Sequence, residues 1–354
     1  MLVMAMWDVF DDDDNNDFRF LRGGQMIRVR LSFLWVLLTA APMYAQPGDS
    51  LLVWPSPPET ARIAHVQTIS SMKDFKQDKG FFAKILSWIT GSESSPQWLV
   101  QPVGIALLPD GRLLVADPGA GCVHVIDIKK REYEFLRETK NGTFLSPVGI
   151  AVGNDGRIYV SDSQRGDISV FDDDLDFVEA IRDQLVRPTG VQIIRGKLYV
   201  ADTGKQGILE FDPDGKFIRQ IGQRGEGDGE FNYPVTVAGK DSLYVVDALN
   251  YRVQKFTPDG TFALAIGRHG GVPGSFSSPK SIALDSRGHL YVTDALMDNF
   301  QIFTSSGELL LIVGRKGLGN GEFLSPGGIA IDREDNIYVV DTLNKRIQIF
   351  RYLR

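Results

Sequence analysis

Six short apolar segments of this chain end in aspartate, and their regular spacing constrains the fold more than any other feature. Their aspartates are 45, 40, 45, 47 and 47 residues apart. Repeats of about 40–50 residues that are rich in short strands are typical of the four-stranded blades of a β-propeller. The sequence therefore predicts an all-β, six-bladed propeller. The segments are Leu113–Asp117, Ile158–Asp162, Leu198–Asp202, Leu243–Asp247, Leu290–Asp294 and Ile337–Asp341.

Each repeat opens with a proline that is followed by small and aliphatic residues, as in Pro147-Val148-Gly149-Ile150. Proline has no N–H group, so it suits the first residue of a strand or an edge strand. Six innermost strands must converge on the axis of a propeller, where small side chains avoid a clash. We therefore expect these segments to border a central channel. The six prolines are Pro102, Pro147, Pro188, Pro234, Pro279 and Pro326.

The last repeat lacks its outermost strand, because only four residues follow Phe350. Residues 62–69, which precede the first repeat, resemble the outer strands of other repeats, such as 217–221. We expect this N-terminal strand to complete the sixth blade, since closing the ring removes exposed sheet edges. The propeller is then predicted to span residues 61–354.

The N-terminal region reads as an export signal. A basic stretch at 26–30 precedes a mostly apolar run at 31–41, and cleavage is expected near Ala45. Residues 1–45 are thus an upstream segment and secretory signal peptide, with an uncleaved membrane anchor as the alternative. Because four aspartates at 11–14 fit a signal poorly, we expect translation to begin at Met26. The mature protein is predicted to be periplasmic or secreted, and the Pro-rich residues 46–60 to be a stiff linker.

Composition limits the chemistry. The net charge of −7 makes nucleic acid an improbable partner, and the single cysteine, Cys122, cannot form an internal disulfide. None of the four histidines has the spacing of a metal site, and no nucleophile elbow is present. The sequence favours a protein that is not an enzyme and needs no cofactor or metal. The alternative is a propeller lyase or hydrolase whose metal site is assembled from several blades.

The best repeats, 247–256 and 341–350, share the pattern Asp-x-x-Asn-x-Arg-aliphatic-Gln-x-Phe, and glycine-rich connectors precede them at 222–231 and 314–323. This pattern resembles the NHL repeat family of six-bladed β-propellers, over roughly residues 61–354. The resemblance implies interaction platforms, sensors, RNA binders or, in some relatives, lyases and hydrolases, so it does not choose a function. The fifth repeat departs from it, with Met297 and Asn299 in place of Asn and Arg.

In a four-stranded meander, the loop between the second and third strands and the connector to the next blade lie on one face. We expect this face to be rich in cations and to bind a partner or an anionic ligand. For Arg252 and Arg346 we favour an internal role, holding the repeated aspartates; for the connector cations both roles stay open. The candidate residues are Arg224, Arg268, His269, Arg315, Lys316, Asn250, Arg252, Asn344 and Arg346.

Residues 70–100 form an insertion between the closing strand and the first repeat. Within it, 81–89 has the apolar spacing of an amphipathic helix. This helix either packs on the propeller rim or uses Phe82 and Trp88 to dock a partner or a membrane surface. We expect an exported binding platform for a protein partner, with an envelope assembly as one setting. A sensor of small anions is a further alternative, and the oligomeric state stays open.

Overall fold

A computed structural model describes residues 17–22, 25–30, 52–71, 75, 99–139 and 142–353. The chain divides into two units, 1–50 and 51–354. In the first unit, β1 (Asp17–Arg22) and β2 (Gln25–Arg30) form an antiparallel pair. The basic start of the predicted signal, 26–30, lies within β2. Export and cleavage near Ala45 stay predictions.

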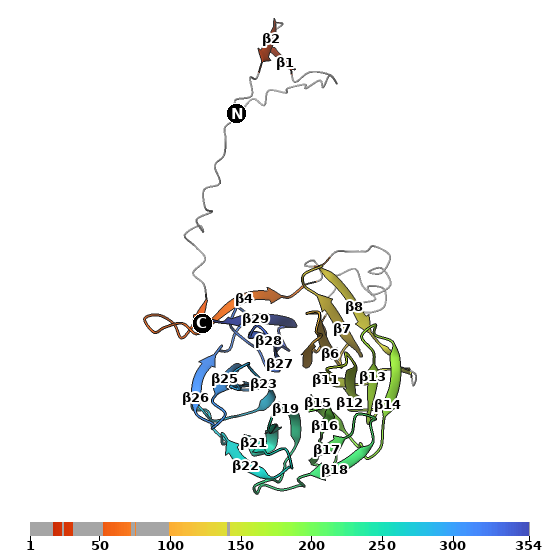
Figure 1. Cartoon of the computed structure of the whole chain (residues 1–354). Coiled ribbons are helices and arrows are strands. Elements are labelled where there is room, and N and C mark those ends of the chain that lie inside the picture. The colour runs from red at the N-terminus through yellow and green to blue at the C-terminus, as the bar shows by residue number, and fades with distance from the viewer. Residues whose placement is uncertain are drawn as a thin grey trace. The chain divides into compact units, whose positions relative to one another are not determined.

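The second unit is a ring of six antiparallel sheets, each a blade; in the first five blades the strands run outward from the axis in chain order (Figure 1). The predicted all-β, six-bladed propeller is therefore confirmed. The strands of blades one to three are β5 (Gly104–Leu107), β6 (Leu113–Asp117), β7 (Cys122–Asp127) and β8 (Glu132–Leu136); β11 (Pro147–Val152), β12 (Ile158–Asp162), β13 (Asp167–Phe171) and β14 (Phe177–Ile181); and β15 (Pro188–Ile194), β16 (Lys197–Asp202), β17 (Gly207–Phe211) and β18 (Phe217–Ile221).

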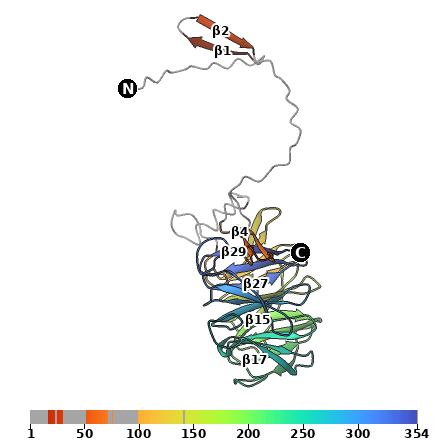
Figure 2. The same cartoon turned by 90° about the vertical axis from the view of Figure 1, so that its left-hand side faces the viewer.

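Blades four and five, and the three inner strands of blade six, follow the same plan. Figure 2 shows the ring from the side, with the inner strand β15 nearer its middle than β17. A small hairpin of β9 (Glu138–Thr139) and β10 (Gly142–Thr143) lies between blades one and two, and a 3-10 turn, η2 (Ala248–Asn250), lies in blade four. The strands are β19 (Pro234–Gly239), β20 (Leu243–Asp247), β21 (Arg252–Phe256) and β22 (Phe262–Ile266); β23 (Pro279–Leu284), β24 (Leu290–Asp294), β25 (Asn299–Phe303) and β26 (Leu309–Val313); and β27 (Pro326–Ile331), β28 (Asn336–Asp341) and β29 (Arg346–Tyr352).

Blade six contains strands from both ends of the propeller unit. The strand β4 (Ile63–Ile69) pairs with β29, and β3 (Val53–Trp54) then pairs with β4 as a fifth strand. The ring of Trp54 packs edge-on against Phe350, with centroids 5.6 Å apart. Part of the predicted linker at 46–60 thus belongs to blade six, because its tryptophan gains apolar contacts there.

Six hydrophobic clusters fill the junctions between neighbouring blades. The second strands are buried on both faces, which explains their unbroken apolar pattern. The two ends of β4 contribute to different clusters. Ile63 packs with blades five and six, whereas Ile69 packs at the junction of blades six and one.

Hydroxyl groups link neighbouring blades around the axis. Thr236 Oγ1 donates to the carbonyl oxygen of Lys280 at 2.7 Å, and Thr293 Oγ1 donates to that of Gly327 at 2.6 Å. Small residues are required at these contacts: a Cβ added to Gly190 would lie 2.5 Å from the Cα of Thr236. The blades therefore approach too closely for larger side chains, as the sequence pattern predicted.

The predicted helix at 81–89 lies outside the described residues, as do Phe82 and Trp88. Its flanks are anchored, because Phe75 and Leu99 are buried in the cluster between blades six and one. Within the described part of the chain, no helix has the length and apolar character needed to cross a bilayer.

Candidate functional site

The links between strands form two faces of the ring. We call the loop face the one formed by the loops between second and third strands and by the connectors between blades. The turn face is formed by the turns between first and second strands and between third and fourth strands. Most of the predicted site residues lie on the loop face, so its geometry decides which of them are available to a ligand.

In blade four, the predicted motif residues are used inside the protein. Asn250 Nδ2 donates to Asp247 Oδ2 at 2.8 Å and to the carbonyl oxygen of Gly225 at 2.9 Å. Arg252 Nε donates to the same carboxylate at 3.0 Å, and its Nη2 donates to two carbonyls of the connector. Burial raises the pKa of Asp247, and these donors only partly offset it. The motif thus ties the loop to the connector that precedes it.

Blade six repeats this arrangement with more hydrogen bonds. Arg346 Nε donates to Asp341 Oδ2 at 2.7 Å, and its terminal nitrogens donate to the carbonyls of Leu318, Gly319 and Glu322. Asn344 Nδ2 reaches Asp341 Oδ2 at 2.8 Å. The internal role that we favoured for Arg252 and Arg346 is confirmed, and the two asparagines share it.

Blade one substitutes a histidine into this network. Seven residues after the repeated aspartate, blades four to six carry glutamine (Gln254, Gln301 and Gln348), whereas blade one carries His124. His124 is fully buried; its Nε2 lies 3.3 Å from Asp117 Oδ2, and its Nδ1 lies 2.7 Å from the hydroxyl of Tyr133. Burial alone would lower the pKa of His124, but Tyr133, Cys122 and Asp117 together raise it well above its ordinary value.

The connector cations differ in their availability. Arg315 pairs with Glu322 at 2.9 Å, and the ring of His269 stacks on Tyr251 with centroids 4.1 Å apart. The side chains of Arg224, Arg268 and Lys316 are exposed, and none of the described residues pairs with them. These three therefore remain candidates for contact with a partner.

The loop face also exposes large hydrophobic side chains, which the sequence interpretation did not single out. Leu249, Leu296 and Leu343 occupy the same position in the loops of blades four, five and six, and are 52%, 71% and 65% exposed. The connectors add four more, of which Leu318 is the most exposed at 72%. Among the described residues, the turns of the turn face expose none. The four connector residues are Leu145, Val186, Val272 and Leu318.

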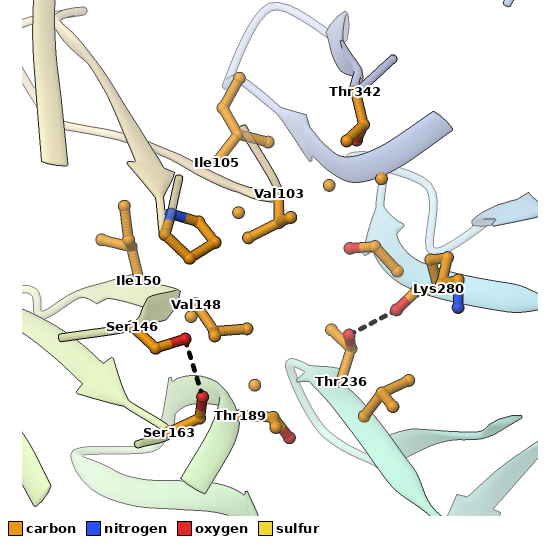
Figure 3. Close-up of a pocket in the computed structure, with 18 of the residues that line it drawn as sticks. Val103, Ile105, Ser146, Val148, Ile150, Ser163, Thr189, Thr236, Lys280 and Thr342 are labelled. Carbon is orange, nitrogen blue, oxygen red and sulfur yellow. Dashed lines mark hydrogen bonds between the residues drawn. The ribbon is translucent and has the colours of Figure 1, made fainter. Parts of the chain in front are cut away.

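A cavity of about 510 Å³ occupies the loop-face end of the central channel (Figure 3). Its walls are built from the residues that precede and follow the six repeat prolines. All six residues after the prolines line it, as do five of the six before them. The residues after the prolines are Val103, Val148, Thr189, Val235, Lys280 and Gly327; those before them are Gln101, Ser146, Arg187, Tyr233 and Ser325.

The cavity contains the functional candidates that sequence reasoning missed. Among the described residues, Arg187 and Lys280 are its two charged side chains, and none of the lining residues is acidic. The signal was present in the sequence at the positions flanking each proline. It could be recognised only after the ring placed these positions around one axis. None of the predicted site residues that the structure describes lines the cavity.

Metal binding finds no support in the described part of the chain, where no group of three or more His, Cys, Asp or Glu side chains could hold an ion. The buried Cys122 lies 3.7 Å from His124 Nε2 inside blade one, away from the cavity lining.

Comparison with known families agrees with this geometry. Residues 144–171 match the NHL repeat model, and residues 182–238 and 285–352 match a family described as 6-bladed beta-propeller. The chain is a six-bladed β-propeller with an NHL repeat. The resemblance noted in the sequence is therefore confirmed. No curated protein has a sequence that matches this chain.

Solved structures share the fold at low identity. A protein of unknown function from Bacteroides thetaiotaomicron is 15% identical, with a TM-score of 0.63 over 98% of this chain and 87% of that one. An auxiliary nutrient binding protein from the same species is 13% identical, with a TM-score of 0.59 over 72% and 70%. A virginiamycin B lyase from Staphylococcus aureus is 15% identical, with a TM-score of 0.53 over 72% and 95%. At these identities the likeness concerns the fold alone.

Proposed function

We propose that this propeller is a non-enzymatic binding platform that docks a protein partner on the loop face of blades five and six. The observation that carries the proposal is the segregation of exposed leucines. On this part of the ring Leu296, Leu318 and Leu343 are each at least 65% exposed. Exposed apolar side chains gathered on one face, among polar neighbours, are typical of interaction sites.

The elements that carry these leucines are joined by hydrogen bonds. Asn344 in the loop of blade six donates to Gly317 in the preceding connector, and the backbone N–H of Ser325 donates to Asp298 in the loop of blade five at 2.8 Å. A surface supported in this way needs little rearrangement on binding, which lowers the entropic cost of association.

Charge indicates the chemistry of the partner. Arg268 and Lys316 are exposed beside the leucines and have no ion-pair partner among the described residues. A partner with a central apolar patch and acidic side chains around it would match both features. We expect this partner to be exported with the chain, in keeping with the signal predicted at 26–45. Sequencing the mature N-terminus tests that part separately.

The enzyme alternative has weaker support. A propeller lyase or hydrolase with a metal site at the channel mouth would need ligands there, but the part of the cavity lining that the structure describes contains neither histidine nor acidic side chains. The inactive virginiamycin B lyase variant has a histidine replaced by alanine. That histidine is a residue of the lyase, and a likeness of fold does not assign its role to a residue of this chain. We therefore give the binding platform precedence.

Site-specific photo-crosslinking in the native host tests the proposal. A crosslinker at Leu296 or Leu343 should capture one protein, whereas a crosslinker at Asp259 on the turn face should not. The captured protein, once purified, should bind the wild-type chain and lose at least tenfold in affinity for Leu296→Asp/Leu343→Asp. The matched control is Val178→Asp/Ile218→Asp, which changes exposed side chains on the outermost strands.

Two outcomes would contradict the proposal. Equal affinity of both double variants for the captured protein would remove the loop face as the docking site. Alternatively, binding of the wild-type chain to anionic lipid vesicles, lost in Leu296→Asp/Leu343→Asp, would assign the leucines to a membrane surface. Circular dichroism melting of both double variants shows whether folding is intact, since exposed positions should change stability little.

A further inference from the structure

The cavity at the loop-face end of the channel has an uneven chemistry that the docking surface does not use. Blades one and two contribute apolar walls, with Val103, Ile105, Val148 and Ile150 among the lining residues. Blades three to five contribute Arg187, Tyr233 and Lys280. Apolar side chains thus predominate on blades one and two, beside the hydroxyls of Ser146 and Ser163, whereas both cations come from blades three and five; Figure 3 shows Val148 and Lys280 on different sides of the cavity. Among the described residues, no carboxylate lines the cavity to neutralise the cations.

The two cations are held by their backbones while their side chains stay available. The carbonyl oxygen of Lys280 accepts the hydroxyl of Thr236 at 2.7 Å. The N–H of Arg187 donates to Asp202 at 3.0 Å, and its carbonyl accepts the N–H of Thr203. Among the described residues, no hydrogen bond or ion pair engages the ammonium of Lys280 or the guanidinium of Arg187.

The arrangement of the ring leaves room beside Lys280. The residues that follow the prolines are uncharged in the other five blades, and the neighbour in blade six is Gly327. The volume of about 510 Å³ falls in the range of sites for small molecules. Lys280 is an exposed residue of the lining, so its flexible side chain can reach an anionic group whose apolar body lies against the valines.

We propose that this cavity binds a small amphipathic anion, a carboxylate or phosphate monoester with an apolar body of about six carbons. Lys280 and Arg187 contact the anionic group, and Tyr233 lies beside them to donate a hydrogen bond. Val103 and Val148 contact the apolar body. A guanidinium and an ammonium suit either anion, because both cations donate charge-assisted hydrogen bonds to oxygen.

This site goes beyond the protein-docking proposal and does not depend on it. A partner could dock on the outer loops whether or not the cavity is filled. Equally, a small molecule could fill the cavity whether or not a partner is docked. The variants that test the two proposals share no residue: the docking test changes Leu296 and Leu343, neither of which lines the cavity.

Titration calorimetry on the full chain with three six-carbon probes tests the proposal. Hexanoate or hexyl phosphate, or both, should bind, whereas hexan-1-ol and acetate should each bind at least tenfold more weakly. A contact with a charged group is worth about 1.5–3 kcal/mol, so Lys280→Met should weaken binding of the anion about tenfold or more. Lys316→Met, an exposed lysine outside the cavity, is the matched control and should change nothing.

The position of the bound anion is determined independently from the NMR signals of valine methyl groups. The anion should shift the signals of Val103, Val148 and Val235, which are assigned by substitution to alanine, and Val148→Asp should abolish binding while leaving the melting temperature close to that of Val148→Ala. If hexan-1-ol binds as well as hexanoate, if Lys280→Met and Lys316→Met behave alike, or if neither anion binds, the proposal is wrong. Preference for hexyl phosphate over hexanoate, or the reverse, identifies which anionic group the site takes.

Discussion

The two faces of this propeller are built from the same six repeats, yet they satisfy their polar groups in different ways. On the turn face, carboxylates cap their own turns: Asp212 accepts the N–H groups of Asp214 and Lys216. On the loop face, Arg346 reaches three carbonyls of a connector more than twenty residues away in the chain. Local hydrogen bonds close each turn, and contacts such as those of Ser286 N–H and Oγ with Asp335 join turns of neighbouring blades. On the loop face, by contrast, a single motif arginine joins a loop to several carbonyls of one connector.

The faces also differ in what they expose. The turns carry polar residues and glycines, while the loop face exposes leucines at equivalent positions of blades four to six. The arginine contacts of the loop face hold these exposed apolar side chains on well-anchored loops. The difference indicates that the residues of the turn face mainly determine the turns, whereas those of the loop face are available for recognition. The following predictions test that contrast.

The largest effect is expected from breaking the loop-face network. Arg346→Ala removes four hydrogen bonds and leaves Asp341 buried without its cation, so we expect a loss of about 3–5 kcal/mol of unfolding free energy. Arg157→Ala on the turn face breaks a more exposed pair with Asp155 and should cost about 1 kcal/mol or less. Urea unfolding measures both, and equal losses would remove the proposed difference between the faces.

Substituting one glycine on each face compares the packing around the two faces, because both glycines have a similar left-handed backbone conformation. Gly321 on the loop face and Gly288 on the turn face have φ angles of +70° and +83°. Alanine at either position incurs about 1–2 kcal/mol for the left-handed backbone. At Gly321 the new Cβ would also lie 2.4 Å from the Trp54 ring, whereas nothing lies within 4 Å at Gly288.

Overpacking against Trp54 should therefore make Gly321→Ala worse than Gly288→Ala by about 1–3 kcal/mol. Adding Trp54→Ala to both glycine variants should abolish most of that difference, because it removes the two nearest atoms and leaves the flexible end of Leu52, at 2.7 Å, free to move. Urea unfolding of the four variants forms the test. A difference that persists without the indole would show that β3 does not constrain this connector.

Much of the fold could be predicted from the sequence, because repetition makes a local pattern visible six times. The prolines, the aspartates and the role of Arg252 all followed from the pattern. The cavity could not, since Arg187 and Lys280 belong to single repeats and gain meaning only when the ring brings them to one axis. The place of Trp54 was missed for a related reason: a Pro-rich segment reads as extended, and its packing on Phe350 depends on a strand from the other end of the unit.

His124, buried inside blade one, permits a comparison of the hydrogen bonds around the repeated aspartate in blade one with those in blades four to six. Because its folded pKa is raised above the unfolded value near 6.5, its contribution to stability is complete below that pH and is lost as the pH rises through the folded pKa. Each pKa unit of difference corresponds to about 1.4 kcal/mol. His124→Gln introduces the residue that other blades use, so it should retain the fold and remove this dependence.

The measurement is the difference in unfolding free energy between wild type and His124→Gln from pH 5.5 to 9. We expect the wild type to lose stability relative to the variant as the pH rises. Gln254→His serves as the converse variant in blade four. A difference that is constant with pH would mean that His124 is neutral throughout, and that its contacts with Asp117 and Tyr133 act only as neutral hydrogen bonds.

The smallest effect is expected on the turn face, at a pair that bridges two blades. Arg195 Nη2 lies 2.8 Å from Asp241 Oδ1, joining blades three and four, but the side chains are 55% and 89% exposed. Water and salt screen such a pair, so Arg195→Ala should change the unfolding free energy by less than about 1 kcal/mol, and by still less in 1 M salt. Urea midpoints at low and high salt check this expectation. A loss as large as that of Arg346→Ala would mean that the cross-blade contacts of the turn face matter as much as those of the loop face, because an exposed pair can matter that much only when other contacts depend on it.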